Sequence, residues 1–220
     1  MRFIATDIPG AFIVALDTQC DERGFFARIF CEEAFAAAGI PMKALQANLS
    51  YNARARTLRG LHFQTPYEEP KLVQCVRGQV WDVALDLRPS SPAYGRSVGV
   101  TLSPETRQLF FVPPGCAHKF LTLADETDVL YLMGMPFMPD GQRGVRWNDP
   151  AFNVSWPAEP TVISPRDASY PDSCRAGCQT SRMPNETAHS VHKTLHHRAG
   201  GVLRGRRRRE WLGRALPRLH

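Results

Sequence analysis

The segment TLRGLHFQ, residues 57–64, combines an arginine, a glycine, a histidine and a glutamine in one short apolar and aromatic stretch. An extended chain of this kind can point one histidine into a protein interior while its neighbours build a sheet. Strict alternation predicts that one face carries Leu58, Gly60 and His62 and the other carries Arg59, Leu61 and Phe63. Lys71 follows shortly afterwards, and His118 is the other histidine before residue 174. We expect these residues at the chemical centre of the protein.

The strand histidine has two interpretations. A lone histidine in a strand is more often a hydrogen-bonded structural residue than a catalyst. Two nearby cations, Arg59 and Lys71, favour the functional interpretation, because cations that face one pocket suit an anionic ligand such as a phosphate.

The composition predicts one globular domain followed by a basic tail. The 220 residues are 43% hydrophobic and carry a formal net charge of +6. Residues 174–220 hold eleven Lys/Arg and two Asp/Glu, so their net charge is +9, whereas residues 1–173 hold 16 basic and 19 acidic residues, a net charge of −3. We expect domain 1–173 to bury one sizeable core. The tail 174–220 has few large apolar residues and is expected to be disordered.

Two alternatives remain for the tail. The run Arg206–Arg209 could contact nucleic acid or another acidic surface, although a nucleic-acid partner is not expected for the domain. A shifted reading frame would give a similar composition. Cys174, Cys178, His189 and His192 suggest a zinc site, but their spacing is loose, and no metal is predicted.

The chain is expected to be cytoplasmic. No stretch approaches the roughly 18 consecutive apolar residues of a membrane span, and the N-terminal residues 1–12 lack the apolar run of a signal peptide. The six cysteines fit reduced thiols in a cytosolic protein; they are Cys20, Cys31, Cys75, Cys116, Cys174 and Cys178.

Short alternating segments separated by glycine and proline turns predict an all-β sandwich or barrel. One helix is expected over 31–38, ended by Gly39 and Pro41. Residues 140–150 are expected to form a polar loop, and Val162-Ile163 to close the domain against an edge. The expected strands are 3–16 (a pair around Pro9-Gly10), 45–51, 57–64, 72–76, 79–87, 97–102, 108–112, 117–123 and 128–133.

Gln46, Asn48 and Ser50 alternate on one face of the segment 45–51. This face is unusually polar for a strand. It either meets solvent or lines a pocket that binds a polar ligand.

Together these segments resemble the dTDP-4-dehydrorhamnose 3,5-epimerases, sugar-nucleotide enzymes of the cupin, or jelly-roll, class. The matching motifs occur in order and span nearly all of residues 1–173. They are DERGFF (21–26), QANLSY (46–51), TLRGLHFQ (57–64), KLVQCVRGQVWDVALDLRPSSPAYG (71–95), FVPPGCAHKF (111–120), VRWNDP (145–150) and SPRDASYPD (164–172). The resemblance implies a cupin-type jelly-roll barrel or sandwich with one or a few short helices.

The resemblance also implies four catalytic residues. His62 would be the base that removes a proton from a carbon next to the sugar's keto group, and Asp167 would hydrogen-bond His62 and hold its tautomer. Tyr131 would be the acid on the opposite face. Lys71 would stabilise the enolate oxygen. Without the resemblance, Tyr131 reads as a core tyrosine and Asp167 as a surface turn residue.

Eight further residues are implied to bind substrate. Arg23 and Phe26 would serve a neighbouring subunit, because family members form homodimers by exchanging strands. The others are Gln46, Asn48, Arg59, His118, Arg143 and Trp147. No cofactor is required, and the His-x-His metal pair of many cupins is missing, because Phe63 and Gln64 follow His62.

Three positions depart from the family pattern. Phe137 stands where a second tyrosine is usual, which favours a single-site 3- or 5-epimerase on another nucleotide sugar as an alternative. Arg28 stands where glutamate is common, so the nucleotide is open. Lys119 stands where glycine is common and should either alter the pocket floor or point outward. A sugar-nucleotide-binding cupin without activity is a further alternative.

Overall fold

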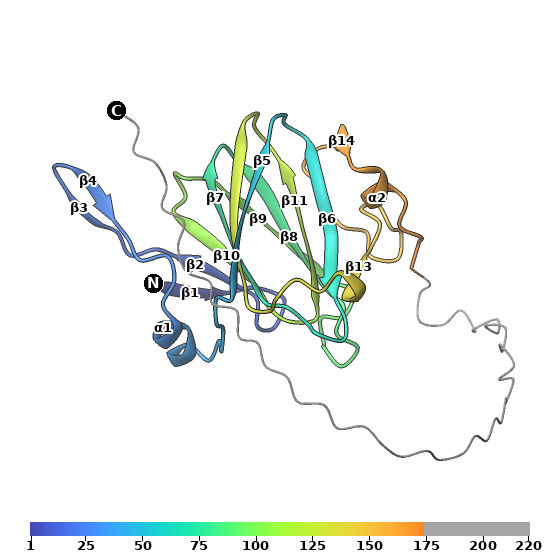
Figure 1. Cartoon of the computed structure of the whole chain (residues 1–220), viewed down its shortest axis with the longest axis horizontal. Helices are drawn as coiled ribbons and strands as arrows, with labels where there is room; N and C mark the ends of the chain where they lie inside the picture. The colour runs from blue at the N-terminus through green and yellow to red at the C-terminus, as the bar shows by residue number, and fades with distance from the viewer. Residues whose placement is uncertain (174–220) are drawn as a thin grey trace, which may run out of the picture. The chain divides into compact units, whose positions relative to one another are not determined.

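The computed structural model describes residues 1–173 as two facing β-sheets with little helix (Figure 1). The first sheet has six strands in the order β1 (Arg2–Ala5), β2 (Phe12–Ala15), β10 (Gln108–Val112), β7 (Lys71–Arg77), β12 (Thr127–Met133) and β5 (Gln46–Asn52). The second has the order β13 (Gln142–Gly144), β6 (Thr57–Gln64), β11 (Cys116–Thr122), β8 (Val80–Asp86) and β9 (Ser97–Leu102), with β14 (Val162–Ile163) also paired to β6.

The remaining elements are short. β3 (Gln19–Asp21) and β4 (Gly24–Phe26) form a separate hairpin, and the helices are α1 (Glu32–Ala37), the 3₁₀ turn η1 (Pro139–Gly141) and α2 (Pro165–Ala168). In the described part of the chain, all strand pairs are antiparallel except β14 with β6. The all-β prediction and the helix near residues 31–38 are therefore confirmed.

The segments after β12 match the sequence prediction in part. The loop expected over 140–150 is wrong at its start, because β13 pairs with β6 there. The predicted closure by Val162-Ile163 is confirmed, since β14 pairs with β6.

The tail 174–220 lies outside the described residues. Within residues 1–173, no helix has the length and apolarity needed to span a bilayer.

The apolar core fills the space between the sheets and one outer face of each. Val73 and Phe110 of the first sheet pack with Ala84 and Phe120 of the second. Phe35 of α1 is fully buried against the outer face of the first sheet. The outer face of the second sheet is covered by the segment after β13, whose Val145 and Phe152 pack on Leu61 and Leu85. The site must therefore lie where polar side chains replace this core.

Strict alternation along β6 is interrupted at Gly60. His118 of β11 lies opposite His62, whereas Phe120 lies opposite Arg59, so a step of two residues along β11 corresponds to a step of three along β6. This β-bulge inserts one residue and moves Arg59 to the same side as His62. The prediction that Arg59 and His62 lie on opposite faces is therefore wrong, because the sequence pattern assumed an unbroken period of two.

We expect Gly60→Ala to destabilise the protein by roughly 2 kcal/mol or more. Gly60 has φ +108°, and an added Cβ would lie 2.5 Å from the His118 carbonyl oxygen. Denaturant unfolding of the full chain measures the effect. Gly24→Ala is the matched control, since Gly24 has φ +125° with nothing within 4 Å of the added Cβ. Equal losses in the two variants would show that the close approach at Gly60 is unimportant.

Candidate active site

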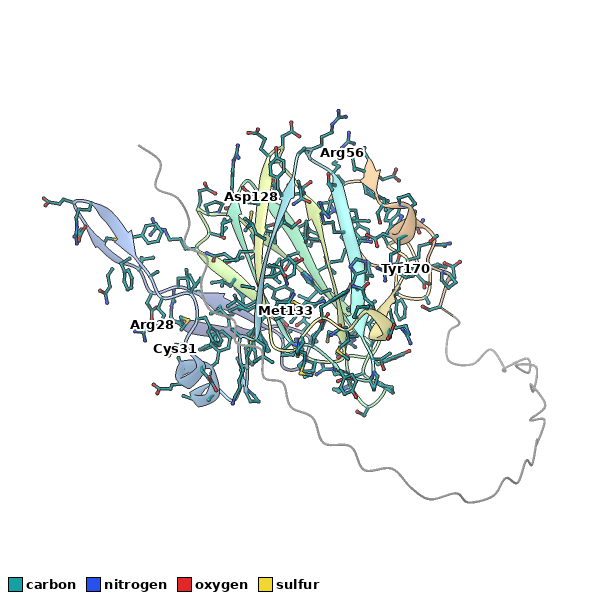
Figure 2. The ribbon with its side chains drawn as sticks, in the orientation of Figure 1. Arg28, Cys31, Arg56, Asp128, Met133 and Tyr170 are labelled. Atoms are coloured by element: carbon teal, nitrogen blue, oxygen red, sulfur yellow. The ribbon has the colours of Figure 1, made fainter. Side chains whose placement is uncertain are left out.

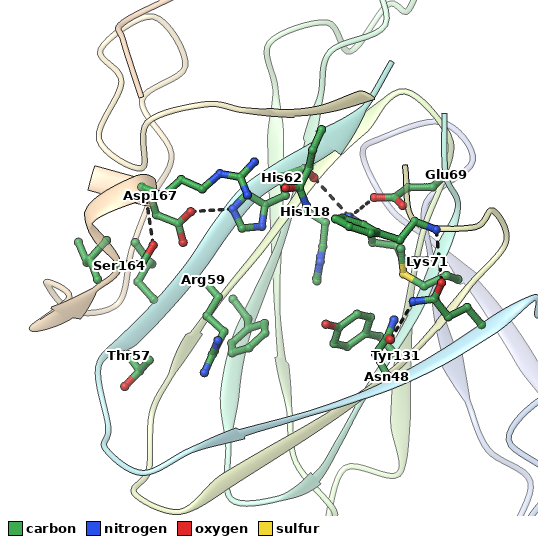
Figure 3. Close-up of a pocket in the computed structure, with 18 of the residues that line it drawn as sticks. Asn48, Thr57, Arg59, His62, Glu69, Lys71, His118, Tyr131, Ser164 and Asp167 are labelled. Carbon is green, nitrogen blue, oxygen red and sulfur yellow. Dashed lines mark hydrogen bonds and ion pairs between the residues drawn. The ribbon is translucent and has the colours of Figure 1, made fainter. Parts of the chain in front are cut away.

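A cavity of about 710 Å³ opens between the two sheets, and both contribute its walls. Figure 3 shows its polar side chains converging from opposite sides. The lining residues are Gln46, Asn48, Thr57, Leu58, Arg59, His62, Glu69, Lys71, His118, Phe120, Tyr131, Met133, Phe137, Gln142, Val162, Ile163, Ser164, Arg166 and Asp167.

The first sheet builds one wall by simple alternation. Tyr131 of β12 lies opposite Asn48 of β5, and Met133 lies opposite Gln46 on one side and Lys71 of β7 on the other. Residues two apart share a face of a strand, so this set faces the cavity together. The polar face of β5 therefore lines a pocket, which resolves the alternative left open by the sequence. The Gln46 amide donates to the Asn48 carbonyl oxygen over 2.9 Å.

The second sheet builds the other wall with His62 and His118 side by side. The buried His118 Nε2 is 2.7 Å from an oxygen of Asp82, which is itself fully buried. The Arg59 Nε donates to Asn52 Oδ1 over 2.7 Å. Both contacts hold cationic or potentially cationic side chains at the cavity, where they can meet an anion.

His62 forms a pair with Asp167 of α2, with 2.7 Å between Nε2 and Oδ1 (Figure 3). The other carboxylate oxygen accepts the Gly60 backbone N–H over 3.1 Å. Ser164 caps α2 by accepting the Asp167 backbone N–H. Burial alone would raise the pKa of Asp167, but the hydrogen bonds from His62 and Gly60 and nearby positive charge hold this pKa below its usual value. Asp167 is therefore an ionised partner for the imidazole, not the surface turn residue that its sequence also allowed.

Lys71 is paired with Glu69, a residue that the sequence analysis did not select. Their N–O distance is 2.8 Å, and each side chain is only 7% exposed. The second oxygen, Glu69 Oε2, has no hydrogen-bond partner among the described residues. Lys71 Nζ also reaches the His62 carbonyl oxygen at 3.4 Å. Glu69 thus keeps a cation in place beside the histidine strand.

Tyr131 is half-buried in the wall facing His62. Burial raises the pKa of the Tyr131 hydroxyl, the positive charge of Arg59 opposes the rise, and the negative charge of Glu69 adds to it. Its phenol therefore stays protonated at neutral pH and can act as a proton donor.

Four predicted binding residues lie outside the lining of this cavity. Arg23 and Phe26 lie on the β3–β4 hairpin, where the Arg23 side chain is 84% exposed and Phe26 is 69% exposed. Arg143 is exposed and donates to the backbone oxygens of Asp140 and Gln142. Trp147 follows β13, and its backbone oxygen accepts from Trp156. Their roles in substrate binding stay predictions.

The three departures from the family pattern occupy different places. Phe137 lines the cavity and is 48% exposed. Arg28 lies near α1 in a second, smaller hollow, away from Met133 at the cavity (Figure 2). Lys119 is absent from the cavity lining, so of its two predicted positions the outward one is confirmed.

Arg166, which was not predicted from the sequence, also lines the cavity from α2. The sequence did contain a signal for it. Ser164-Pro165 is typical of a helix start, and Arg166 and Asp167 follow in the first turn, so a helix that carries Asp167 to the site carries Arg166 as well. For Glu69, the signal was its position two residues before Lys71. Within residues 1–173, no three His, Cys, Asp or Glu side chains gather as a metal-binding group.

Solved structures similar to this chain include sugar epimerases. The dTDP-4-dehydrorhamnose 3,5-epimerase of Bacillus anthracis, solved with TDP and PPi bound, matches with a TM-score of 0.75 and 34% identity, covering 78% of this chain and 99% of that chain. ChmJ, a 3'-monoepimerase from Streptomyces bikiniensis solved with dTDP-quinovose, matches with a TM-score of 0.70 and 29% identity, covering 76% and 85%. The fold is thus the cupin-type jelly roll that the sequence predicted.

Sequence comparison narrows this class to one family. Residues 5–173 match the family model described as dTDP-4-dehydrorhamnose 3,5-epimerase. The enzyme of that name from Methanothermobacter thermautotrophicus is 41% identical over 172 residues, which cover 77% of this chain and 92% of that protein. The chain belongs to the dTDP-4-dehydrorhamnose 3,5-epimerase family and is an isomerase.

Proposed function

We propose that the protein converts dTDP-4-dehydro-6-deoxy-D-glucose to dTDP-4-dehydro-L-rhamnose by moving protons at carbons next to the ketone. The observation that carries this proposal is the placement of His62 with Asp167 on one wall of a cavity and Tyr131 with Lys71 on the other. Inversion at a carbon needs a base on one face and an acid on the opposite face. Binding alone would require neither.

The contact between His62 and Asp167 supports one direction of proton transfer. An ionised carboxylate only accepts hydrogen bonds, so His62 Nε2 carries the proton that Asp167 accepts, and Nδ1 is left to take a proton from the sugar carbon. The electron pair of the broken C–H bond moves to the keto oxygen as an enolate. Lys71 stabilises this developing negative charge. Tyr131 then gives its proton to the carbon from the other face, and solvent restores both groups.

The nucleotide would be held by the cations of the cavity and by a neighbouring subunit. Arg59 and His118 line the cavity and suit a diphosphate. The β3–β4 hairpin extends away from the two sheets (Figure 1) and exposes Phe25 and Phe26. We infer a homodimer in which this hairpin brings Arg23 and Phe26 to the partner's cavity. A cytoplasmic location fits a reaction on a nucleotide sugar.

Deuterium uptake from D2O tests the reaction directly. We expect NMR to show exchange at both C3 and C5 of dTDP-4-dehydro-6-deoxy-D-glucose. A reductase added to the reaction should trap the L-sugar product. No exchange at either carbon, with this or other nucleotides, would favour the sugar-nucleotide-binding cupin.

A single-site epimerase is the second candidate function, and Phe137 favours it. This ring lines the cavity, and its backbone N–H donates to the Gln46 side chain at 3.3 Å. Without a hydroxyl it cannot hydrogen-bond the sugar. Exchange at one carbon in the wild type, with exchange at both in Phe137→Tyr, would establish this alternative.

A further inference from the structure

Lys119 is a fully buried lysine directly behind the wall that carries both histidines. Its neighbours along β11, His118 and Phe120, line the cavity, so alternation turns Lys119 to the outer face of the second sheet. The side chain is 0% exposed. An added Cβ on Gly60 would lie 3.1 Å from the Lys119 Cβ, so Lys119 packs against the bulge of β6. It therefore lies next to the backbone that Asp167 contacts.

The amine of Lys119 has no hydrogen-bond partner among the described residues. The Trp156 ring lies with its centroid 5.3 Å from Nζ, which offers the ammonium a cation–π contact and no hydrogen-bond acceptor. A buried ammonium without an acceptor is strongly disfavoured. Burial accordingly lowers the pKa of Lys119 to about 7, and the negative charge of Asp167 opposes this change.

Of the ionisable groups on β8, β6 and α2, Asp167 is the one whose charge acts on Lys119. On β8 its cross-strand partner is the apolar Val83, and Asp82 is engaged by His118. On β6 the ionisable side chains are Arg59 and His62, and both line the cavity on the other face of the sheet. On α2, Arg166 is exposed, whereas Asp167 is buried and acts on Lys119 through its charge. Asp167 therefore hydrogen-bonds His62 and also acts on Lys119 through its charge.

We propose that Lys119 is a positioning residue that acts on His62 through Asp167. When Lys119 is an ammonium, its positive charge offsets part of the negative charge of the Asp167 carboxylate, so Asp167 stabilises the imidazolium of His62 less and His62 is a weaker base. When Lys119 is a neutral amine, the carboxylate stabilises the imidazolium fully. This inference rests on the proposed role of His62 as the base, but the coupling itself is a property of the free protein.

The sign of the effect follows from the charges. Below about pH 7 Lys119 is protonated, and a second cation near Asp167 disfavours the imidazolium form of His62. Removing the amine therefore makes His62 take up its proton at a higher pH. In the reaction, the acid limb of kcat/KM, where the base becomes protonated, moves to higher pH as well.

Histidine NMR on the full chain tests the coupling without any activity. We expect the midpoint of the His62 titration to move up by on the order of half a pH unit in Lys119→Met. Lys119→Arg keeps a permanent positive charge and should not move it upward. Lys43→Met, which removes an exposed lysine, is the control and should leave it unchanged. The signal is assigned by its loss in His62→Gln.

The reverse measurement uses the lysine side chain. With ¹³C-labelled lysine, Lys119 in the wild type should titrate near pH 7, and Asp167→Asn should lower that midpoint because the carboxylate that favours the ammonium is gone. A His62 midpoint that stays in place in Lys119→Met, or moves down, would overturn the inference. If that midpoint shifts but no substrate exchanges deuterium, the proposed function fails while the coupling stands.

Discussion

His62→Ala should lose deuterium exchange into the sugar by roughly 10³-fold or more while it still binds dTDP. Removing a positioned general base costs about 10²–10⁴-fold in rate. Here the loss should lie toward the upper end, because the two groups on the opposite wall, Lys71 and Tyr131, are a cation and a protonated phenol, and the remaining carboxylates Glu69 and Asp167 are held by Lys71 and by the Gly60 backbone N–H. Exchange at C3 and C5 by NMR and dTDP affinity by calorimetry measure the two quantities separately.

His118→Asn is the matched control, because His118 lies directly opposite His62 in the neighbouring strand and is also paired with an aspartate. We expect the reverse pattern, with weaker dTDP binding and exchange largely retained at saturating substrate. Retained deuterium exchange in His62→Ala would contradict the assignment of His62 as the base. Loss of dTDP binding in His62→Ala alone would instead make His62 a binding residue.

The sequence predicted the strands well because most of them keep a strict period of two. The face of Gln46 and Asn48, and the placement of Tyr131 in the wall with Lys71, follow from alternation and register. The face of Arg59 could not be predicted in this way. One inserted residue at Gly60 reverses the orientation of everything before it in β6, and a glycine in a strand only hints at such a bulge.

The parts of the structure that sequence pattern alone could not place depend on contacts between residues far apart in the chain. Asp167 was placed through the resemblance, since a four-residue helix after an irregular segment has no periodic signal. Lys119 offers a sharper case. The sequence places a lysine on a strand, where a solvent-exposed ammonium is the ordinary expectation. Only the packing of Trp156 over the lysine and the complete burial of Lys119 show that its amine is enclosed.

Lys119→Met should stabilise the protein at neutral pH by on the order of 3 kcal/mol. Methionine fills a similar volume without an amine to desolvate. The unfolded chain keeps its lysine protonated up to about pH 10.5, whereas the folded chain does so only below about pH 7. Between these values the unfolded state of the wild type binds more protons, so this group makes wild-type stability rise with pH.

The advantage of Lys119→Met should therefore be largest at and below about pH 7 and should shrink as the pH rises toward about 10.5. Guanidinium unfolding of both full-length proteins at equal concentration, at several pH values in this range, measures it. Lys43→Met is again the control, because an exposed lysine near Glu32 contributes little. An advantage that grows with pH, or a Lys119→Met variant less stable than the wild type at pH 7, would mean that the buried amine is well solvated or paired. In that case it would keep its charge at neutral pH, and its influence on Asp167 would no longer change with pH there.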